Sequence, residues 1–462
     1  MARVVVATPD VLGTSMAGPA IRALQFARAL SAEHEVELVS TTGCTRSGDP
    51  FPVRQVTAAD VDELVTRTDV WVVQGSVLQG FPQIAASPAC VVVDLYAPYH
   101  LENLEPTGNR SPRERLGAVH NATVALNGGM LRGDFFLTAS DKQRDFWLGA
   151  LAALGRVNPL TYDQDSSLRS LVAIVPFGVE DAAPAHTRPA LRGVTPGIGA
   201  GDKVLLWGGG IYNWFDPLTL VRAVDALCGD HPDLRLVFLG GKHPNPAVLE
   251  MRMAVEVRAL ADQLGLTGRH VFFNEGWVPY DERGSFLLEA DIGVSTHLEH
   301  VETAFSFRTR ILDYLWAGLP VVATAGDVFA QVLEHSGAGI TVPPGDAPAL
   351  VDALAALLDD DVRRKAAARA SAALAEDYRW DRVVQPLLEF CRSATRAPDL
   401  LDRTAAAHLA RPLEPVRAPT PGPAGWRGEV ALARQYVQRG GLPLLLRRIL
   451  TRARKLLRGQ TW

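Results

Sequence analysis

Short apolar runs alternate with longer helical patterns along most of the chain, and this alternation constrains the fold more than any other feature. In the first half the apolar runs are Val4–Ala7, Val36–Ser40, Val70–Val73, Cys90–Asp94, Phe135–Ala139 and Val172–Val175. The second half begins the pattern afresh with Val204–Trp207, Leu234–Leu239, Val271–Asn274, Ile292–Ser295, Pro320–Ala323 and Gly339–Val342. Strands that alternate with helices build βαβ units around a parallel sheet. The sequence therefore predicts an α/β chain with two Rossmann-like domains that face a central cleft.

The limits of these domains follow from changes in composition. A Pro- and Gly-rich segment at residues 183–203 indicates a linker, which gives a first domain at 1–182 and a second at 183–395. Residues 396–462 form a tail, in which a stretch dense in Pro, Gly and Ala precedes a last helical pattern. In paired α/β domains the binding site is expected where the carboxyl ends of the two sheets meet.

Charge and cysteine usage exclude several classes of function. The net charge of −5 gives no basic field for nucleic acid. The four cysteines are scattered without a CxxC pair, which argues against a zinc site or a disulfide framework. The N-terminus lacks the pattern of a signal peptide, and no apolar stretch reaches the roughly 20 residues of a spanning helix. We therefore expect a cytoplasmic protein that binds neither metal nor nucleic acid.

Glycine-rich turns follow three of the predicted strands. Gly18 precedes a helix that begins near Ala20, Gly208 to Gly210 follow the first strand of the second domain, and Gly240-Gly241-Lys242 follow the next strand. Backbone N–H groups in such turns can bind an anion, and Lys242 adds a cation at the same sheet edge. Either the turns bind a phosphate or the glycines only shape loops.

The stretch from Ser295 to Thr324 carries the densest set of polar candidates. A helix is predicted to begin near Phe305 or Ser306, with Arg308 and Arg310 close to its N-terminus, where phosphates bind. Asp313 is expected about two turns into the helix, where its carboxylate could accept hydrogen bonds from ribose hydroxyls. Glu302, in the preceding loop, is a candidate for the reacting carbon of a sugar.

This stretch resembles the donor-binding motif of family 4 glycosyltransferases, which are retaining enzymes with the GT-B fold. In that family two glutamates stand eight positions apart before a turn similar to AGLPVVAT. Counting back from Gly318 places Asp313 at the second position and Phe305 at the first, so that Glu302 is taken as the substitute. The variant FRTRILDYLWAGLP resembles bacterial members associated with polysaccharide or lipid-linked glycan synthesis.

Two further segments extend the resemblance over residues 1–395. PFGVE resembles the end of the family's first domain, and EGWVPYDER resembles the segment whose backbone contacts the donor base, here around Trp277 and Val278. The resemblance implies a nucleotide-diphosphate sugar of UDP, GDP, ADP or dTDP type as donor, with no cofactor required. The expected donor-binding residues are Gly18, Gly209, Gly210, Asn213, Lys242, Trp277, Val278, Ser306, Arg308, Arg310 and Asp313.

The acceptor side is expected at the end of the strand Cys90–Asp94. Asp94, Tyr96 and His100 follow in VVVDLYAPYHLENLE, and family 4 members often place a histidine in a comparable loop. The alternative is a surface histidine in a Pro-containing loop. The catalytic candidates are His100, Glu302, Lys242 and Arg308, with Lys242 and one arginine stabilising the departing nucleoside diphosphate.

The last helical pattern, residues 444–458, combines leucines at helical spacing with arginines and a lysine between them. A basic amphipathic helix after a flexible linker is typical of an anchor on an anionic membrane surface. Peripheral attachment to the inner face of the membrane would suit a lipid-linked acceptor. The alternative is that the leucine face packs on the enzyme or on a second copy.

The sequence thus predicts a retaining glycosyltransferase that moves a hexosyl group onto a glycan, lipid-linked or natural-product acceptor. One alternative is a nucleotide-sugar epimerase or hydrolase of the same fold. The other is a catalytically inactive binding subunit, because Phe305 occupies the first glutamate position of the family motif.

Overall fold

The computed structural model describes residues 1–105, 111–241, 243, 251–402, 404, 405 and 407, together with 430, 433, 434, 442 and 446. By its contacts the chain divides into two units, Met1–Leu409 and Ala410–Trp462. The predicted tail helix at 444–458 lies outside the described residues apart from Leu446, and Lys242 also lies outside them.

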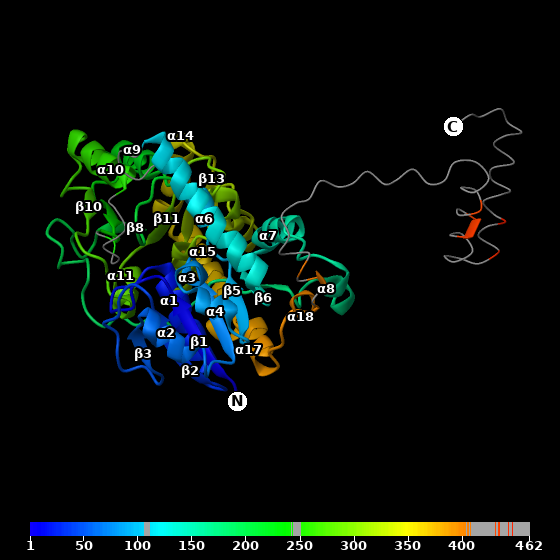
Figure 1. Cartoon of the computed structure of the whole chain (residues 1–462). Helices are drawn as coiled ribbons and strands as arrows, with labels where there is room; N and C mark the ends of the chain where they lie inside the picture. Colours follow the sequence, from blue (N-terminus) through cyan, green and yellow to red (C-terminus); the bar gives the residue numbers. More distant parts are fainter. Residues whose placement is uncertain are drawn as a thin grey trace, which may run out of the picture. The chain divides into compact units, whose positions relative to one another are not determined.

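The first sheet has seven parallel strands in the order β3-β2-β1-β4-β5-β6-β7. Figure 1 labels β1, β2 and β3 near the N-terminus. Its strands are β1 (Arg3–Thr8), β2 (Glu35–Ser40), β3 (Val53–Gln55), β4 (Val70–Gln74), β5 (Cys90–Asp94), β6 (Phe135–Thr138) and β7 (Val172–Ile174). The helices between them are α1 (Gly18–Leu30), α2 (Ala58–Leu64), α3 (Val77–Gly80), α4 (Pro82–Ala86), α5 (Tyr99–Glu102), α6 (Pro112–Arg132), α7 (Asp141–Ala153) and α8 (Pro159–Gln164).

The second sheet has six parallel strands in the order β10-β9-β8-β11-β12-β13. Its strands are β8 (Lys203–Trp207), β9 (Leu234–Phe238), β10 (Val271–Phe273), β11 (Ile292–Ser295), β12 (Val321–Thr324) and β13 (Gly339–Val342). The accompanying helices are α9 (Pro217–Leu227), α10 (Arg252–Gln263), α11 (Arg283–Leu288), α12 (Thr309–Trp316), α13 (Val328–Ser336), α14 (Ala347–Leu358) and α15 (Asp361–Ala375). The predicted α/β architecture with two Rossmann-like sheets is confirmed.

Every predicted strand is present, and the structure adds β3, which the sequence analysis missed. β3 is a three-residue strand at the edge of its sheet, and none of its side chains is fully buried. An edge strand buries one face at most, so it need not show the continuous apolar run by which interior parallel strands are found.

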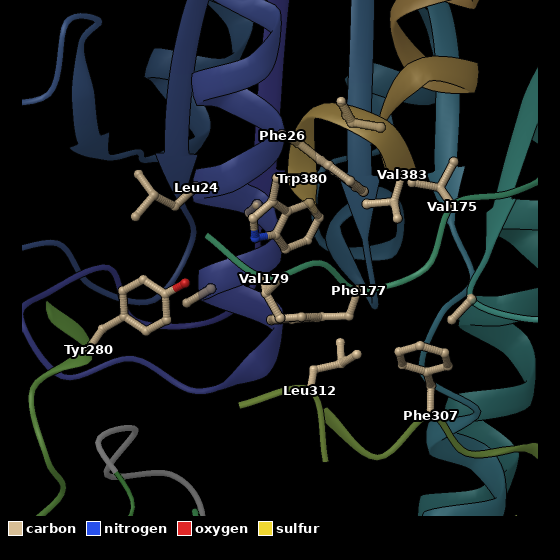
Figure 2. Close-up of a cluster of buried hydrophobic side chains, with 14 of the residues drawn as sticks. Leu24, Phe26, Val175, Phe177, Val179, Tyr280, Phe307, Leu312, Trp380 and Val383 are labelled. Carbon is tan, nitrogen blue, oxygen red and sulfur yellow. The ribbon is translucent and has the colours of Figure 1, made fainter. Parts of the chain in front are cut away.

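After the second sheet the chain returns to the first domain through α16 (Trp380–Val383), α17 (Gln385–Arg392) and α18 (Pro398–Leu401). The Trp380 ring packs against Phe26 of α1 and against Phe177, with ring centroids 6.1 and 5.1 Å apart (Figure 2). Farther along, a fully buried ion pair joins Arg156 to Asp399, with 2.7 Å between Nε and Oδ2. The two sheets are therefore held together by two chain crossings, one after β7 and one before α16. The domain limits 1–182 and 183–395 stay a prediction.

Within the described residues, no helix is long and apolar enough to cross a bilayer.

Candidate active site

The carboxyl ends of both sheets open onto one cleft, a cavity of about 540 Å³. From the first domain it is lined by residues that follow β1 and β5, including Asp10, Tyr96 and Glu102. From the second domain the lining comes from the glycine turns after β8 and β9 and from the start of α12. The cleft thus lies where the topology of paired parallel sheets predicts a binding site.

The glycine turns of the second domain bring backbone very close to backbone. A Cβ atom at Gly240 would lie 2.2 Å from the carbonyl oxygen of Gly209, and Gly209 itself has φ near +80°. The Gly208 N–H donates to the Tyr314 hydroxyl at 2.7 Å, which fixes this turn to α12. Gly18, Gly209 and Gly210 all line the cleft, and their contacts with a donor stay a prediction.

The approach to α12 differs from the prediction. The helix begins at Thr309, not near Phe305 or Ser306, because a 3₁₀ turn at Thr303–Phe305 is followed by an extended Ser306 with φ −82° and ψ 155°. Arg308 is therefore the N-cap residue, and Asp313 lies about one turn into the helix instead of two. Ser306 is buried and lines the cleft.

Glu302 and Arg308 are paired inside the cleft wall. Both Nη atoms of Arg308 donate to the two carboxylate oxygens of Glu302, at 2.9 and 2.8 Å. The guanidinium also lies over the Phe215 ring, 4.8 Å from its centroid, while its Nε is buried without a partner among the described residues. The two catalytic candidates of this segment therefore act as one unit.

Arg310 is held differently and keeps a donor unused. Its Nη2 donates to the Gly210 carbonyl at 2.7 Å, and its guanidinium lies 4.4 Å from the Trp207 ring centroid and 4.1 Å from that of Phe215. Nη1 is buried with no hydrogen-bond partner in the described part of the chain, and burial lowers the pKa of the guanidinium to about 10. An unused, buried cationic donor in a cavity wall is suited to an anionic ligand.

Asp313 and Trp277 complete the second-domain wall. Arg283 donates to Asp313 at 3.0 Å, and burial raises the pKa of the Asp313 carboxyl. The Trp277 indole N–H donates across the cleft to the Met16 carbonyl at 3.1 Å, and Val278 beside it also lines the cavity. Asn213 is not among the described lining residues, because its side chain accepts from the Met253 N–H at the start of α10.

Of the three side chains expected from the first domain, only Tyr96 is among the described lining residues of the cleft. Asp94 is fully buried behind the cleft, where Arg22 donates to it at 2.7 and 3.0 Å and Gln74 at 3.0 Å. Tyr96 does line the cavity. His100 is not among the described lining residues and packs between Phe146 and Trp147, with centroids 5.7 and 5.6 Å away.

Glu102 was not singled out from the sequence, yet it lines the cleft. It stands two residues after His100 on the single turn α5, and residues two apart face different sides of a helix. Burial raises the pKa of Glu102 to about 8, with a further increase from the negative charge of Glu302 and an opposing effect of Arg308. The sequence signal that could have identified Glu102 is its acidic side chain in the same short stretch as Asp94 and His100.

Over the described residues, no cluster of His, Cys, Asp or Glu side chains has the arrangement of a metal site.

Comparison with known proteins agrees with this geometry. Residues 202–360, which carry the glycine turns, the Glu302–Arg308 pair and α12, match the family model described as Glycosyl transferases group 1. The second domain is a group 1 glycosyltransferase domain. The resemblance to family 4 glycosyltransferases stated from the sequence is confirmed.

A curated relative matches part of this chain. The D-inositol 3-phosphate glycosyltransferase of Corynebacterium urealyticum is 31% identical over 206 residues, which are 44% of this chain and 46% of that protein. The chain thus spans about half the length of the curated relatives it matches.

Solved structures share the fold over most of the chain. WaaG, a glycosyltransferase involved in lipopolysaccharide biosynthesis, superimposes with a TM-score of 0.60 at 16% identity and covers 85% of this chain and 100% of its own. Anabaena Alr3699/HepE in complex with UDP-glucose gives a TM-score of 0.58 at 14% identity, with coverage of 85% and 100%. The GT-B fold predicted from the sequence is confirmed.

Proposed function

We propose that this chain transfers a sugar from a nucleoside-diphosphate sugar to a hydroxyl acceptor, with retention of the anomeric configuration as in family 4. The observation that carries the proposal is the wall formed by the glycine turns and the start of α12. There Arg310 keeps a buried donor unused beside the Gly210 carbonyl, and the side chain of the N-cap residue does not cap α12. Such a helix N-terminus can bind an anion. WaaG and HepE, which share the fold, are respectively named as a glycosyltransferase and as a complex with UDP-glucose.

The chemistry proposed for the donor side is electrostatic. As the glycosidic bond to the diphosphate breaks, negative charge develops on the leaving oxygen, and Arg310 with the α12 N-terminus stabilises it. Arg308 holds Glu302 in place at the reacting end of the cleft. Lys242, outside the described residues, stays a predicted contact of the diphosphate. The donor's ribose is assigned to Asp313 and its base to the segment of Trp277 and Val278.

The acceptor is proposed to be a glycan or a lipid-linked molecule. The family resemblance supports this class, as does the basic amphipathic pattern at 444–458. WaaG, of the same fold, is described as involved in lipopolysaccharide biosynthesis. We propose that the tail holds the enzyme at the inner face of the membrane.

Thermal unfolding of the whole chain with UDP, GDP, ADP, CMP and dTDP tests the donor site. A ligand at about 100 times its dissociation constant stabilises the folded state by roughly 2.7 kcal/mol, so one diphosphate is expected to raise the melting temperature. The Arg310→Ala variant should show at most about half of this stabilisation at the same ligand concentration. No shift with any nucleotide would contradict the donor site.

Incubation with the corresponding sugar nucleotides separates the alternatives. Isomerisation of the sugar nucleotide would favour the epimerase, and hydrolysis that no added acceptor accelerates would favour the hydrolase. Phe305, at the family's first glutamate position, supports the alternative of a catalytically inactive binding subunit. A chain that binds nucleotides but releases no nucleoside diphosphate from any sugar nucleotide would be identified as the inactive subunit.

A further inference from the structure

One carboxyl group faces the cleft from the first domain without a partner. Glu102 ends α5 and lines the cavity, as do Glu302 and Arg308 of the second domain. Within the described residues its carboxylate takes part in no hydrogen bond and no ion pair. By contrast, Glu302 is occupied by Arg308, and Asp94 by Arg22 and Gln74.

Contacts on both sides hold Glu102 close to the Glu302 loop. The Gln143 amide donates at 2.7 Å to the Tyr96 carbonyl, just before α5, and at 2.7 Å to the Phe305 carbonyl of the second domain. Three residues after Glu102, Glu105 lies 3.6 Å from His300, between Oε1 and Nε2. The segment with Glu102 is thus tied at both ends to the loop that carries Glu302.

The histidine of α5 is turned away from the cleft. His100 packs between Phe146 and Trp147, and its Nδ1 is buried without a partner in the part of the chain that the structure describes. Burial lowers the pKa of His100, which keeps its ring neutral. Burial raises the pKa of Tyr99, also on α5, to about 12, and Tyr99 is not among the described lining residues either. Glu102 is therefore the group of α5 placed to exchange a proton with a molecule in the cleft.

We propose that Glu102 is a catalytic residue of the acceptor side, whose carboxylate accepts the proton of the acceptor hydroxyl. In this step the acceptor oxygen bonds to the anomeric carbon, the bond from that carbon to the diphosphate oxygen breaks, and the nucleoside diphosphate leaves with the electron pair. The proton ends on the Glu102 carboxyl and returns to solvent when the products leave. The proposal rests on the glycosyl transfer proposed above.

The environment of Glu102 suits this task. Burial raises its pKa to about 8, and the negative charge of Glu302 contributes to the increase. A base whose pKa lies near the working pH combines a usable carboxylate fraction with a strong affinity for the proton. Because only the carboxylate accepts a proton, the rate should rise with pH until about pH 8 and then level off.

The test uses the whole chain and whichever of UDP-glucose, GDP-mannose, ADP-glucose and dTDP-glucose releases its nucleoside diphosphate fastest, with water as the acceptor. Glu102→Gln should lower kcat about 100-fold or more and abolish the rise of the rate with pH. Its affinity for the nucleoside diphosphate should stay within about twofold of the wild-type value, as expected for a group that acts only in the transition state. Formate should restore part of the rate in Glu102→Ala.

The matched control is Glu63→Gln, which removes an exposed carboxylate of α2 and should leave rate and pH profile unchanged. A Glu102→Gln variant with a wild-type rate and pH profile would overturn the role of Glu102 and leave glycosyl transfer standing. So would a rate loss that formate does not restore and that is matched by a loss of nucleotide affinity. If the wild-type chain binds no nucleoside diphosphate, or releases none from the four sugar nucleotides, glycosyl transfer itself fails and the role of Glu102 with it.

Discussion

Glu302 and Arg308 meet through two hydrogen bonds of 2.9 and 2.8 Å, with side chains only 2% and 5% exposed. The pair closes the loop between β11 and α12, and this loop delays the start of the helix to Thr309. Two buried charges in this geometry stabilise the fold only as long as both are present.

Removal of one partner should therefore be costly. Arg308→Ala is expected to lower the free energy of unfolding by about 3–5 kcal/mol, because Glu302 is left as an uncompensated buried charge. The double variant Glu302→Leu/Arg308→Met should recover most of that loss. Urea unfolding at pH 7 measures both, and an Arg308→Ala variant as stable as the wild type would contradict a structural role of the pair.

Arg310 should contribute mainly to ligand binding. Its Nη1 is a buried donor without a partner among the described residues. Hydrogen bonds to charged groups contribute about 1.5–3 kcal/mol. Arg310→Ala is expected to lower the affinity for the nucleoside diphosphate by about 10- to 150-fold, as measured by isothermal titration calorimetry. Arg222→Ala, at an exposed position of α9, is the control and should bind like the wild type.

Gly240 is the turn residue least able to accept a side chain. A Cβ atom there would lie 2.2 Å from the Gly209 oxygen and 2.5 Å from the Gly210 nitrogen, and both are backbone atoms. Gly240→Ala should lower stability by about 1–3 kcal/mol and displace the Gly209–Gly210 turn, with loss of nucleotide binding. Gly229→Ala, where no atom lies within 4 Å of the added Cβ, should change neither property.

The parallel sheets could be predicted because their interior strands are buried on both faces and appear as continuous apolar runs. β5, for example, was predicted with its observed limits, Cys90–Asp94. The start of α12 could not be predicted in the same way. It depends on the Glu302–Arg308 pair, which fixes a loop by side-chain contacts that carry no periodic signal.

The acceptor side of the cleft is a second feature that could not be predicted from the sequence. Asp94 follows a strand, like many catalytic carboxylates, but its partner Arg22 lies 72 residues away in α1 and neutralises it. His100 and Glu102 are equally polar in the sequence, and only the packing of α5 against Phe146 and Trp147 directs the histidine away from the cleft. Which of two neighbouring polar residues faces a cavity is decided by tertiary contacts.

Asp327 makes the stability of the fold depend on pH. Its side chain is 1% exposed and caps α13 through the Phe329 and Ala330 N–H groups, and burial raises its pKa to about 6. A raised pKa in the folded state favours the protonated fold, so this stabilisation is complete below about pH 3.8 and is lost as the pH rises through 6. Asn at this position keeps the cap without the charge. The free energy of unfolding of Asp327→Asn, measured in urea, should therefore rise relative to that of the wild type by about 2 kcal/mol between pH 4 and pH 7.5. An equal difference at both pH values would contradict the shift.

The tail can be separated from the unit Met1–Leu409. Asp399, paired with Arg156 inside the first domain, lies ahead of Leu409, so a chain that ends at Leu409 retains this anchor. It should keep the melting temperature and nucleotide affinity of the whole chain but lose sedimentation with vesicles of anionic lipid.

Each cation of the 444–458 pattern contributes about 1 kcal/mol near such a surface. Replacement of Arg447, Arg454 and Lys455 by Glu in the whole chain should therefore abolish sedimentation as well, and high salt should weaken it in the wild type. Vesicle binding that survives both changes would place the membrane contact on the first unit instead of the tail.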